Sequence, residues 1–100
     1  MSHKENSACE HALRLRQQFA AVRFRYITTE LDLAITECES AANTPDVCVK
    51  CRMLAHARNF YEAAEHAKEH GEFTKAMRAE IELRELRLNS LLLVARLPLN

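Results

Sequence analysis

Asn43-Thr44-Pro45-Asp46 separates two long helix-forming segments and decides how the chain is organised. Proline lacks the backbone N–H that a helix interior needs, but it fits the first turn of a helix, where that N–H has no partner. We expect Thr44 to be an N-cap, Pro45 to be the first helical residue, and Asp46 to complement the helix dipole. One helix should therefore end before this stretch and another should begin within it.

The chain before this stretch predicts a single helix. Ser7 and Glu10 form a Ser-x-x-Glu capping box, which predicts a helix start near residue 7 after a flexible segment over residues 1–6. With an end near Ala42, the helix has about 35 residues and a length of roughly 52 Å. Two apolar stripes run along it, so it should be covered from two directions. One contains Ala20, Phe24, Ile27, Leu31, Ala34, Cys38 and Ala41, and the other contains Leu15, Phe19, Val22, Tyr26 and Leu33.

Gly71, the only glycine, divides the remaining chain into two helices. Glycine at this place is typical of a left-handed helix C-cap. We expect helices over residues 45–70 and 73–97, the second ending at Pro98 and leaving a tail over residues 98–100. The buried stripe of the first should be Met53, Ala57, Phe60, Ala64 and Ala67, and that of the second Ala76, Ala79, Leu83, Leu86, Leu93 and Leu97.

The composition favours helices over strands. The 100 residues include 1 glycine and 2 prolines, and the strong helix formers Ala, Leu, Glu and Arg dominate. A chain of this length makes one domain with a thin core. We predict an all-α fold, a three-helix antiparallel bundle with a long first helix and a helical hairpin, over residues 7–97.

The order of charges along the first two helices predicts their relative direction. The first helix is basic early and acidic late, and the second repeats this order, so folding back about Thr44 brings opposite charges together at both ends. The residues are Arg14, Arg16, Arg23, Arg25, Glu30, Asp32, Glu37 and Glu39 in the first helix, and Lys50, Arg52, Arg58, Glu62, Glu65 and Glu69 in the second.

The overall charge balance excludes a strong general attraction to polyanions. Lys and Arg total 14, as do Asp and Glu, so we expect neither nucleic acid nor a membrane as a partner. The longest apolar run, over residues 91–95, is far shorter than the ~20 residues that span a bilayer. No signal-peptide pattern is visible, so a cytoplasmic location with reduced cysteines is expected.

The functional prediction is a protein-interaction module. In the antiparallel register the second helix ends opposite about residue 19, so the first turns of the first helix project beyond it, either as a contact surface or as a frayed end. We expect a protein partner or a homo-oligomer, with a dimer favoured, and neither catalysis nor a cofactor. Candidate interface residues are Ala12, Leu13, Leu15, Phe19, Leu91 and Leu92.

The cysteines suggest an alternative function, metal binding or a redox response. Cys48 and Cys51 form a Cys-x-x-Cys pair at a helix start, where thiol pKa values tend to fall. Cys38 should approach them across the turn, and His56 could supply a fourth ligand. The competing interpretation is that these cysteines are ordinary small hydrophobic residues.

His66 to His70 spells His-x-x-Glu-His, the inverted zinc-protease pattern of two imidazoles one turn apart with a glutamate. The segment ends a helix beside Gly71 in a chain without a second lobe, so protease activity is not expected. His70 near a helix C-terminus is explained by its favourable interaction with the dipole.

The chain on both sides of Gly71, with Phe60, Ala63, Ala64 and Ala67 before it and residues 71–76 from it onwards, resembles the helix-turn-helix of one tetratricopeptide repeat. Gly71 would permit the tight turn, Phe73 is the aromatic residue after it, and small residues would let the two helices meet. The similarity departs at Glu80, where an aromatic residue is usual, and at Leu88, where a proline is usual. It implies a helical hairpin with an interaction role over about 30 residues.

A long helix followed by two shorter ones also resembles the all-helical chorismate mutases, which are intertwined dimers that hold a dicarboxylate with basic side chains. Such a site requires a basic residue late in the first helix, and none occurs between Arg25 and Lys50. The resemblance therefore extends to the architecture and not to the chemistry.

Overall fold

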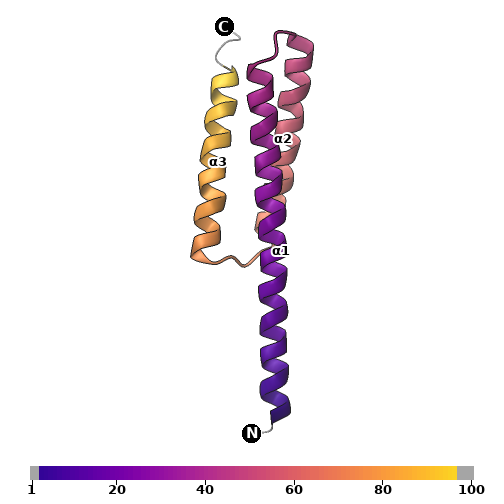
Figure 1. Cartoon of the computed structure of the whole chain (residues 1–100), viewed down its shortest axis with the longest axis vertical. Coiled ribbons are helices and arrows are strands. Elements are labelled where there is room, and N and C mark those ends of the chain that lie inside the picture. Colours follow the sequence, from indigo (N-terminus) through magenta and orange to yellow (C-terminus); the bar gives the residue numbers. More distant parts are fainter. Residues whose placement is uncertain (1–2, 97–100) are drawn as a thin grey trace.

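The computed structural model describes residues 3–96, and within this range every regular element is a helix (Figure 1). They are α1 (His3–Ala42), α2 (Val47–Glu69) and α3 (Lys75–Arg96). The prediction of an all-α bundle with a long first helix is confirmed. None of these described helices is both long and apolar enough to cross a membrane.

The bundle is organised around α1. α2 folds back along α1 in the antiparallel direction, and α3 lies along another side of α1 (Figure 1). The backbone of α1 packs closely against those of α2 and α3, whereas the backbones of α2 and α3 come close to each other at only a few positions. The α2–α3 segment therefore lacks the close helix packing implied by the tetratricopeptide resemblance.

The core lies along one face of α1. Ile27 and Leu31 of α1 are fully buried, as are Ile81 and Leu88 of α3, and each of these side chains is at most 2% exposed. Burying a side chain of this size contributes about 1.5–3 kcal/mol. α2 adds Ala57, Ala64 and Ala67, whose small size lets its backbone approach α1. The first stripe of α1 from Ile27 onwards and the alanines of the α2 stripe are thus confirmed as core, whereas Ala20, Phe24, Met53 and Phe60 are only partly buried.

The predicted face of α3 is wrong. Leu83 is 64% exposed, Leu86 67% and Leu93 62%, and Ala76 and Ala79 are exposed as well. Ile81 and Leu88 face the core instead, together with the partly buried Leu91 and Leu92. Leu97 and the predicted tail over residues 98–100 lie outside the described residues.

The predicted starts of the first two helices also need correction. α1 begins at His3, so Ser7 lies inside the helix and residues 3–6 belong to it. Residues 1–2 lie outside the described range. α2 begins at Val47 and not at Pro45, and its N-cap is Asp46, whose carboxylate accepts hydrogen bonds from the amides of Cys48 at 2.9 Å and Val49 at 3.2 Å.

Thr44 is not the N-cap because its hydroxyl is engaged elsewhere. It donates a hydrogen bond of 2.8 Å to the carbonyl of Ser40 and so satisfies the C-terminal end of α1. The ionised carboxylate of Asp46 is the stronger acceptor for amides at a helix N-terminus. The turn was placed correctly, but its two polar residues serve different helices.

Gly71 does not adopt the left-handed conformation expected of it, since no described glycine has a positive φ. α2 ends at Glu69 with His70 as its C-cap, at φ −106° and ψ 8°. α3 begins at Lys75, two residues later than predicted, after the hydroxyl of Thr74 accepts a hydrogen bond of 3.1 Å from the amide of Met77. The connection therefore turns without a positive φ.

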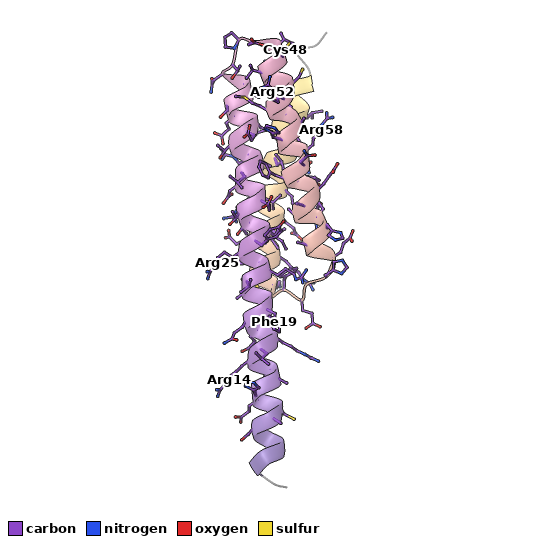
Figure 2. All side chains as sticks on the ribbon, turned by 90° about the vertical axis from the view of Figure 1, so that its right-hand side faces the viewer. Arg14, Phe19, Arg25, Cys48, Arg52 and Arg58 are labelled. Carbon is purple, nitrogen blue, oxygen red and sulfur yellow. The ribbon has the colours of Figure 1, made fainter. Side chains whose placement is uncertain are left out.

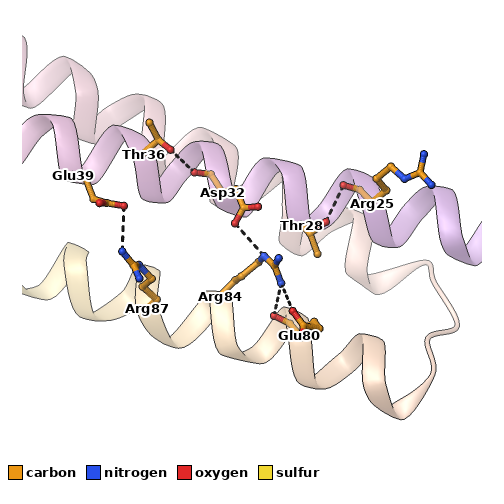
Figure 3. A network of polar contacts seen from close by, with 8 residues as sticks. All are labelled: Arg25, Thr28, Asp32, Thr36, Glu39, Glu80, Arg84 and Arg87. Carbon is orange, nitrogen blue, oxygen red and sulfur yellow. Dashed lines mark hydrogen bonds and ion pairs between the residues drawn. The ribbon is translucent and has the colours of Figure 1, made fainter.

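The acidic end of α1 pairs with α3 and not with α2 (Figure 3). Asp32 contacts Arg84 at 3.0 Å and Glu39 contacts Arg87 at 3.4 Å. Arg84 also contacts Glu80 on its own helix at 2.8 Å. Over residues 7–95, no ion pair joins α1 to α2. The antiparallel direction of α2 was predicted correctly, but not the partners of the acidic residues.

Candidate interaction surface

The first turns of α1 project beyond the other helices, as predicted (Figure 1). The C-terminal end of α2 is fixed against α1 where the guanidinium of Arg23 donates a hydrogen bond of 3.2 Å to the carbonyl of Ala67. Further towards its N-terminus α1 extends alone, which gives the chain its dimensions of 69 × 20 × 17 Å (Figure 1). We call residues 7–19, whose side chains are all exposed, the overhang.

The second apolar stripe of α1 is exposed along its whole length. Phe19 and Val22 are each 67% exposed and Tyr26 is 47% exposed. Leu15 at 37% and Leu33 at 41% extend the stripe in both directions. The chain itself therefore covers only one of the two stripes, because α2 and α3 both pack around the other stripe. We call Leu15, Phe19, Val22 and Tyr26 the α1 stripe.

The α1 stripe borders a groove between α1 and α2. The groove has a volume of about 530 Å³. Phe19, Val22 and Tyr26 line it from α1, and its lining from α2 includes Ala63, His66 and His70. Its lining is largely apolar, which distinguishes it from the larger hollow of about 760 Å³ between α1 and α3, where the ion pairs of Asp32 and Glu39 lie.

The surface around the α1 stripe carries exposed basic residues on α1 and exposed acidic residues on the neighbouring end of α2. Figure 2 shows Arg14 and Arg25 extending away from the bundle on the same side of α1, and Arg16 is exposed on the overhang. Near the groove, the end of α2 carries the exposed acidic residues Glu62 and Glu69. None of these five side chains takes part in an ion pair within residues 7–95.

The candidate interface residues divide into two groups. Ala12, Leu13, Leu15 and Phe19 are exposed on the overhang, with Leu13 at 56%. Leu91 and Leu92, by contrast, are partly buried and pack against the core. The exposed apolar residues at that end of α3 are Leu93 and Val94, which the sequence analysis did not name as interface candidates.

The cysteine residues do not gather into a site. Cys38 is only 2% exposed, and burial, reinforced by Glu37 and Glu39, raises the pKa of its thiol. Cys48 and Cys51 are exposed at the start of α2, and His56 is exposed further along it. Among the described residues these four form no group of three close ligand atoms. Metal binding by these four residues therefore lacks its geometry in the described part of the chain, while the redox response stays a prediction.

A different group of ligand-bearing side chains does come together. His66, Glu69 and His70 each offer a ligand atom, and these atoms lie within 4.8 Å of one another. The two imidazole rings meet edge to face, with centroids 5.1 Å apart. All three residues are exposed. These residues belong to the His-x-x-Glu-His pattern, for which no protease activity is expected and in which the helix dipole accounts for His70 alone.

Lys68 joins the end of α2 to α3. Its ammonium contacts Glu65 at 2.9 Å and Glu85 at 2.6 Å. Burial lowers the pKa of Lys68, but hydrogen bonds and charge attraction from Glu85 and Glu65 outweigh this effect and raise it. Lys68 thus stays charged and is held on the α3 side of α2.

Comparisons of the chain with known protein families, with curated proteins and with solved structures found no match.

Proposed function

We propose that the protein is a self-associating interaction module in which two copies pair through the α1 stripe. The observation that carries the proposal is the exposure of four consecutive stripe residues, Leu15, Phe19, Val22 and Tyr26, at 37% to 67%. Contiguous apolar surface on a small protein marks an interaction site. A chain with so thin a core gains from covering this surface with a second copy.

The spacing of the α1 stripe suits helix pairing. Its residues follow the 4-3-4 spacing of a coiled-coil seam, in which each side chain enters a hole on the facing helix. In an antiparallel pair centred between Phe19 and Val22, these two residues face each other across the seam. Leu15 of one copy then faces Tyr26 of the second copy, so large side chains meet along the whole stripe.

The charges oppose a parallel pair more strongly than this antiparallel one, in which Arg16 of one copy lies opposite Arg25 of the second copy. The overhang of each copy, with Arg14 and Arg16, passes α2 of the second copy, where Glu62 and Glu69 are exposed. A parallel pair would instead place Arg14 beside Arg14 and Arg16 beside Arg16. Each surface pair contributes only about 0.2–1 kcal/mol, so the charges select the direction and the apolar stripe supplies most of the affinity.

Sedimentation equilibrium over a range of concentrations tests the proposal. We expect the wild-type chain to dimerise and Val22→Glu to raise the dimer dissociation constant by at least about tenfold, since the substitution enters a two-fold interface twice. Leu86→Glu is the matched control, because Leu86 of α3 is 67% exposed, like Val22, but lies outside the α1 stripe.

A strict monomer at high micromolar concentration would refute self-association. Loss of the dimer in Leu86→Glu, with no change in Val22→Glu, would instead assign the interface to α3.

Disulfide cross-linking tests the direction of pairing. In a background where the exposed cysteines Cys9, Cys48 and Cys51 are serine, Leu15→Cys alone should not cross-link, because the antiparallel pair separates the two copies of residue 15. The double variant Leu15→Cys/Tyr26→Cys should form a covalent dimer. Efficient cross-linking of the single variant would show a parallel pair.

A further inference from the structure

We infer that His66, Glu69 and His70 form a binding site for a divalent transition-metal ion of the zinc class. Residues at i, i+3 and i+4 of a helix lie on one face, so the ordinary α-helical backbone of α2 brings the three side chains together. Their ligand atoms lie within 4.8 Å of one another. A tetrahedral ion bound at about 2.0–2.2 Å holds its ligand atoms roughly 3.3–3.6 Å apart, so small rotations of these exposed side chains bring the three atoms around one ion.

The donor set selects the class of metal. Two imidazole nitrogens and one carboxylate oxygen suit zinc, copper and nickel, whereas calcium and magnesium prefer sites made of oxygen alone. Three protein ligands leave at least one coordination position for water or another group. The exposure of all three residues gives an ion direct access from solvent.

The surrounding charges also favour a cation. The three residues lie in and directly after the last turn of α2, which ends at Glu69, where the helix dipole is negative. The nearest lysine, Lys68, is held by Glu65 and Glu85 towards α3. Arg23 lines the same groove as His66 and His70, but its guanidinium donates to the carbonyl of Ala67.

Zinc titration by isothermal titration calorimetry tests the inference on the full chain without an affinity tag. Cys9, Cys48 and Cys51 are replaced by serine so that exposed thiols do not compete. We expect one zinc ion per chain, with His66→Ala and His70→Ala each weakening binding by at least about tenfold, because loss even of a residue that only supports a ligand has effects of that size. His56→Ala, an exposed histidine on the same helix, should bind zinc like the parent chain.

No binding at millimolar zinc, or binding unchanged in His66→Ala and His70→Ala, would overturn the inference. Far-UV circular dichroism of each variant establishes that the helices remain folded. The same titration on Val22→Glu separates the metal site from self-association, because the three ligands come from one chain and should bind zinc in the monomer.

Discussion

At Gly71 the chain passes from α2 towards α3 without a positive φ, so the requirement for glycine comes from the space around it. A Cβ at this position would clash with Cζ of Phe73 and would lie 2.6 Å from Cε2 of Phe73 and 2.8 Å from Cδ of Arg23. Phe73 is itself partly buried against the core. We expect Gly71→Ala to lower the free energy of unfolding by about 1–3 kcal/mol through overpacking, measured by urea denaturation.

A double-mutant cycle separates this steric effect from a backbone effect. In a Phe73→Ala background the closest contacts disappear, so Gly71→Ala should be nearly neutral or stabilise the fold by about 0.4–1 kcal/mol through the unfolded chain. An equal loss of stability in both backgrounds would show that the backbone of residue 71, and not the ring of Phe73, requires glycine.

Lys68 gives a second prediction at the level of single residues, with a defined pH dependence. The raised pKa of Lys68 means that its pairs stabilise the folded state below pH 10.5, the ordinary value, and that this contribution disappears as the pH rises through the higher folded value. Because Lys68 is 39% exposed, solvent screens its pairs, and we expect Lys68→Met to reduce stability by about 1 kcal/mol at pH 7.

The acidic partners determine what happens at low pH. Without Lys68, Glu65 and Glu85 face each other as like charges, and protonation of either relieves the repulsion. The stability difference between wild type and Lys68→Met should therefore shrink as the pH falls below about 4.5, near the ordinary glutamate pKa. Urea denaturation across pH measures this, with Lys75→Met, an exposed lysine outside these ion pairs, as the control. A difference that is constant with pH would exclude this electrostatic origin.

Among the helices, α3 shows most clearly what the sequence could not predict. Its most regular apolar spacing, which includes Leu83, Leu86 and Leu93, faces solvent. The buried face around Ile81 and Leu88 includes Arg84 and Glu85, which are only partly exposed. These two pair with Asp32 of α1 and Lys68 of α2, so charged residues border the buried seam. Periodicity within one helix cannot reveal such partners, because they lie far away in the sequence.

For α1 and α2 the apolar periodicity did predict the buried faces, because these faces consist mainly of apolar residues. Ile27, Leu31 and Ala34 form an apolar stripe, and the alanines of α2 match it. The overhang followed from helix lengths and the turn at Asn43, which the sequence marks clearly. The exposed α1 stripe was visible as a pattern, but its exposure depends on where α3 docks, and the sequence did not predict that position.

Two substitutions on α3 test its orientation directly. Ile81→Ala should destabilise the protein by about 2–5 kcal/mol, because it removes a buried side chain and leaves a cavity. Leu83→Ala, two residues away and 64% exposed, should change stability by less than about 0.5 kcal/mol. Urea denaturation of both at a concentration where the chain is monomeric measures the contrast. A larger loss of stability in Leu83→Ala than in Ile81→Ala would mean that the face of α3 predicted from periodicity is the buried one.

Over the whole molecule, folding and association use different parts of α1. The core cluster begins at Phe24 and Ile27, and every other member follows later in the chain. The overhang is exposed throughout residues 7–19. A helix of this length without tertiary contacts is marginal in water, since most helical stability in proteins comes from packing of an apolar face. A second copy lying along the overhang would supply that packing.

Deletion of residues 1–14 tests this division of roles. The shortened chain keeps the core cluster, so its free energy of unfolding as a monomer should change by less than about 0.5 kcal/mol. The deletion removes Arg14 and leaves Leu15 and Arg16 at the new N-terminus. Leu15, which faces Tyr26 of the second copy in the antiparallel pair, is then no longer held within a stable helix. Its dimer dissociation constant should rise by at least about tenfold, because loss of about 1.4 kcal/mol at the interface suffices for that change. Urea denaturation at low protein concentration and sedimentation equilibrium at high protein concentration measure the two quantities separately.

A large loss of monomer stability in the shortened chain would mean that the overhang supports the fold. An unchanged dimer dissociation constant would mean that the overhang is a frayed end without a role in association.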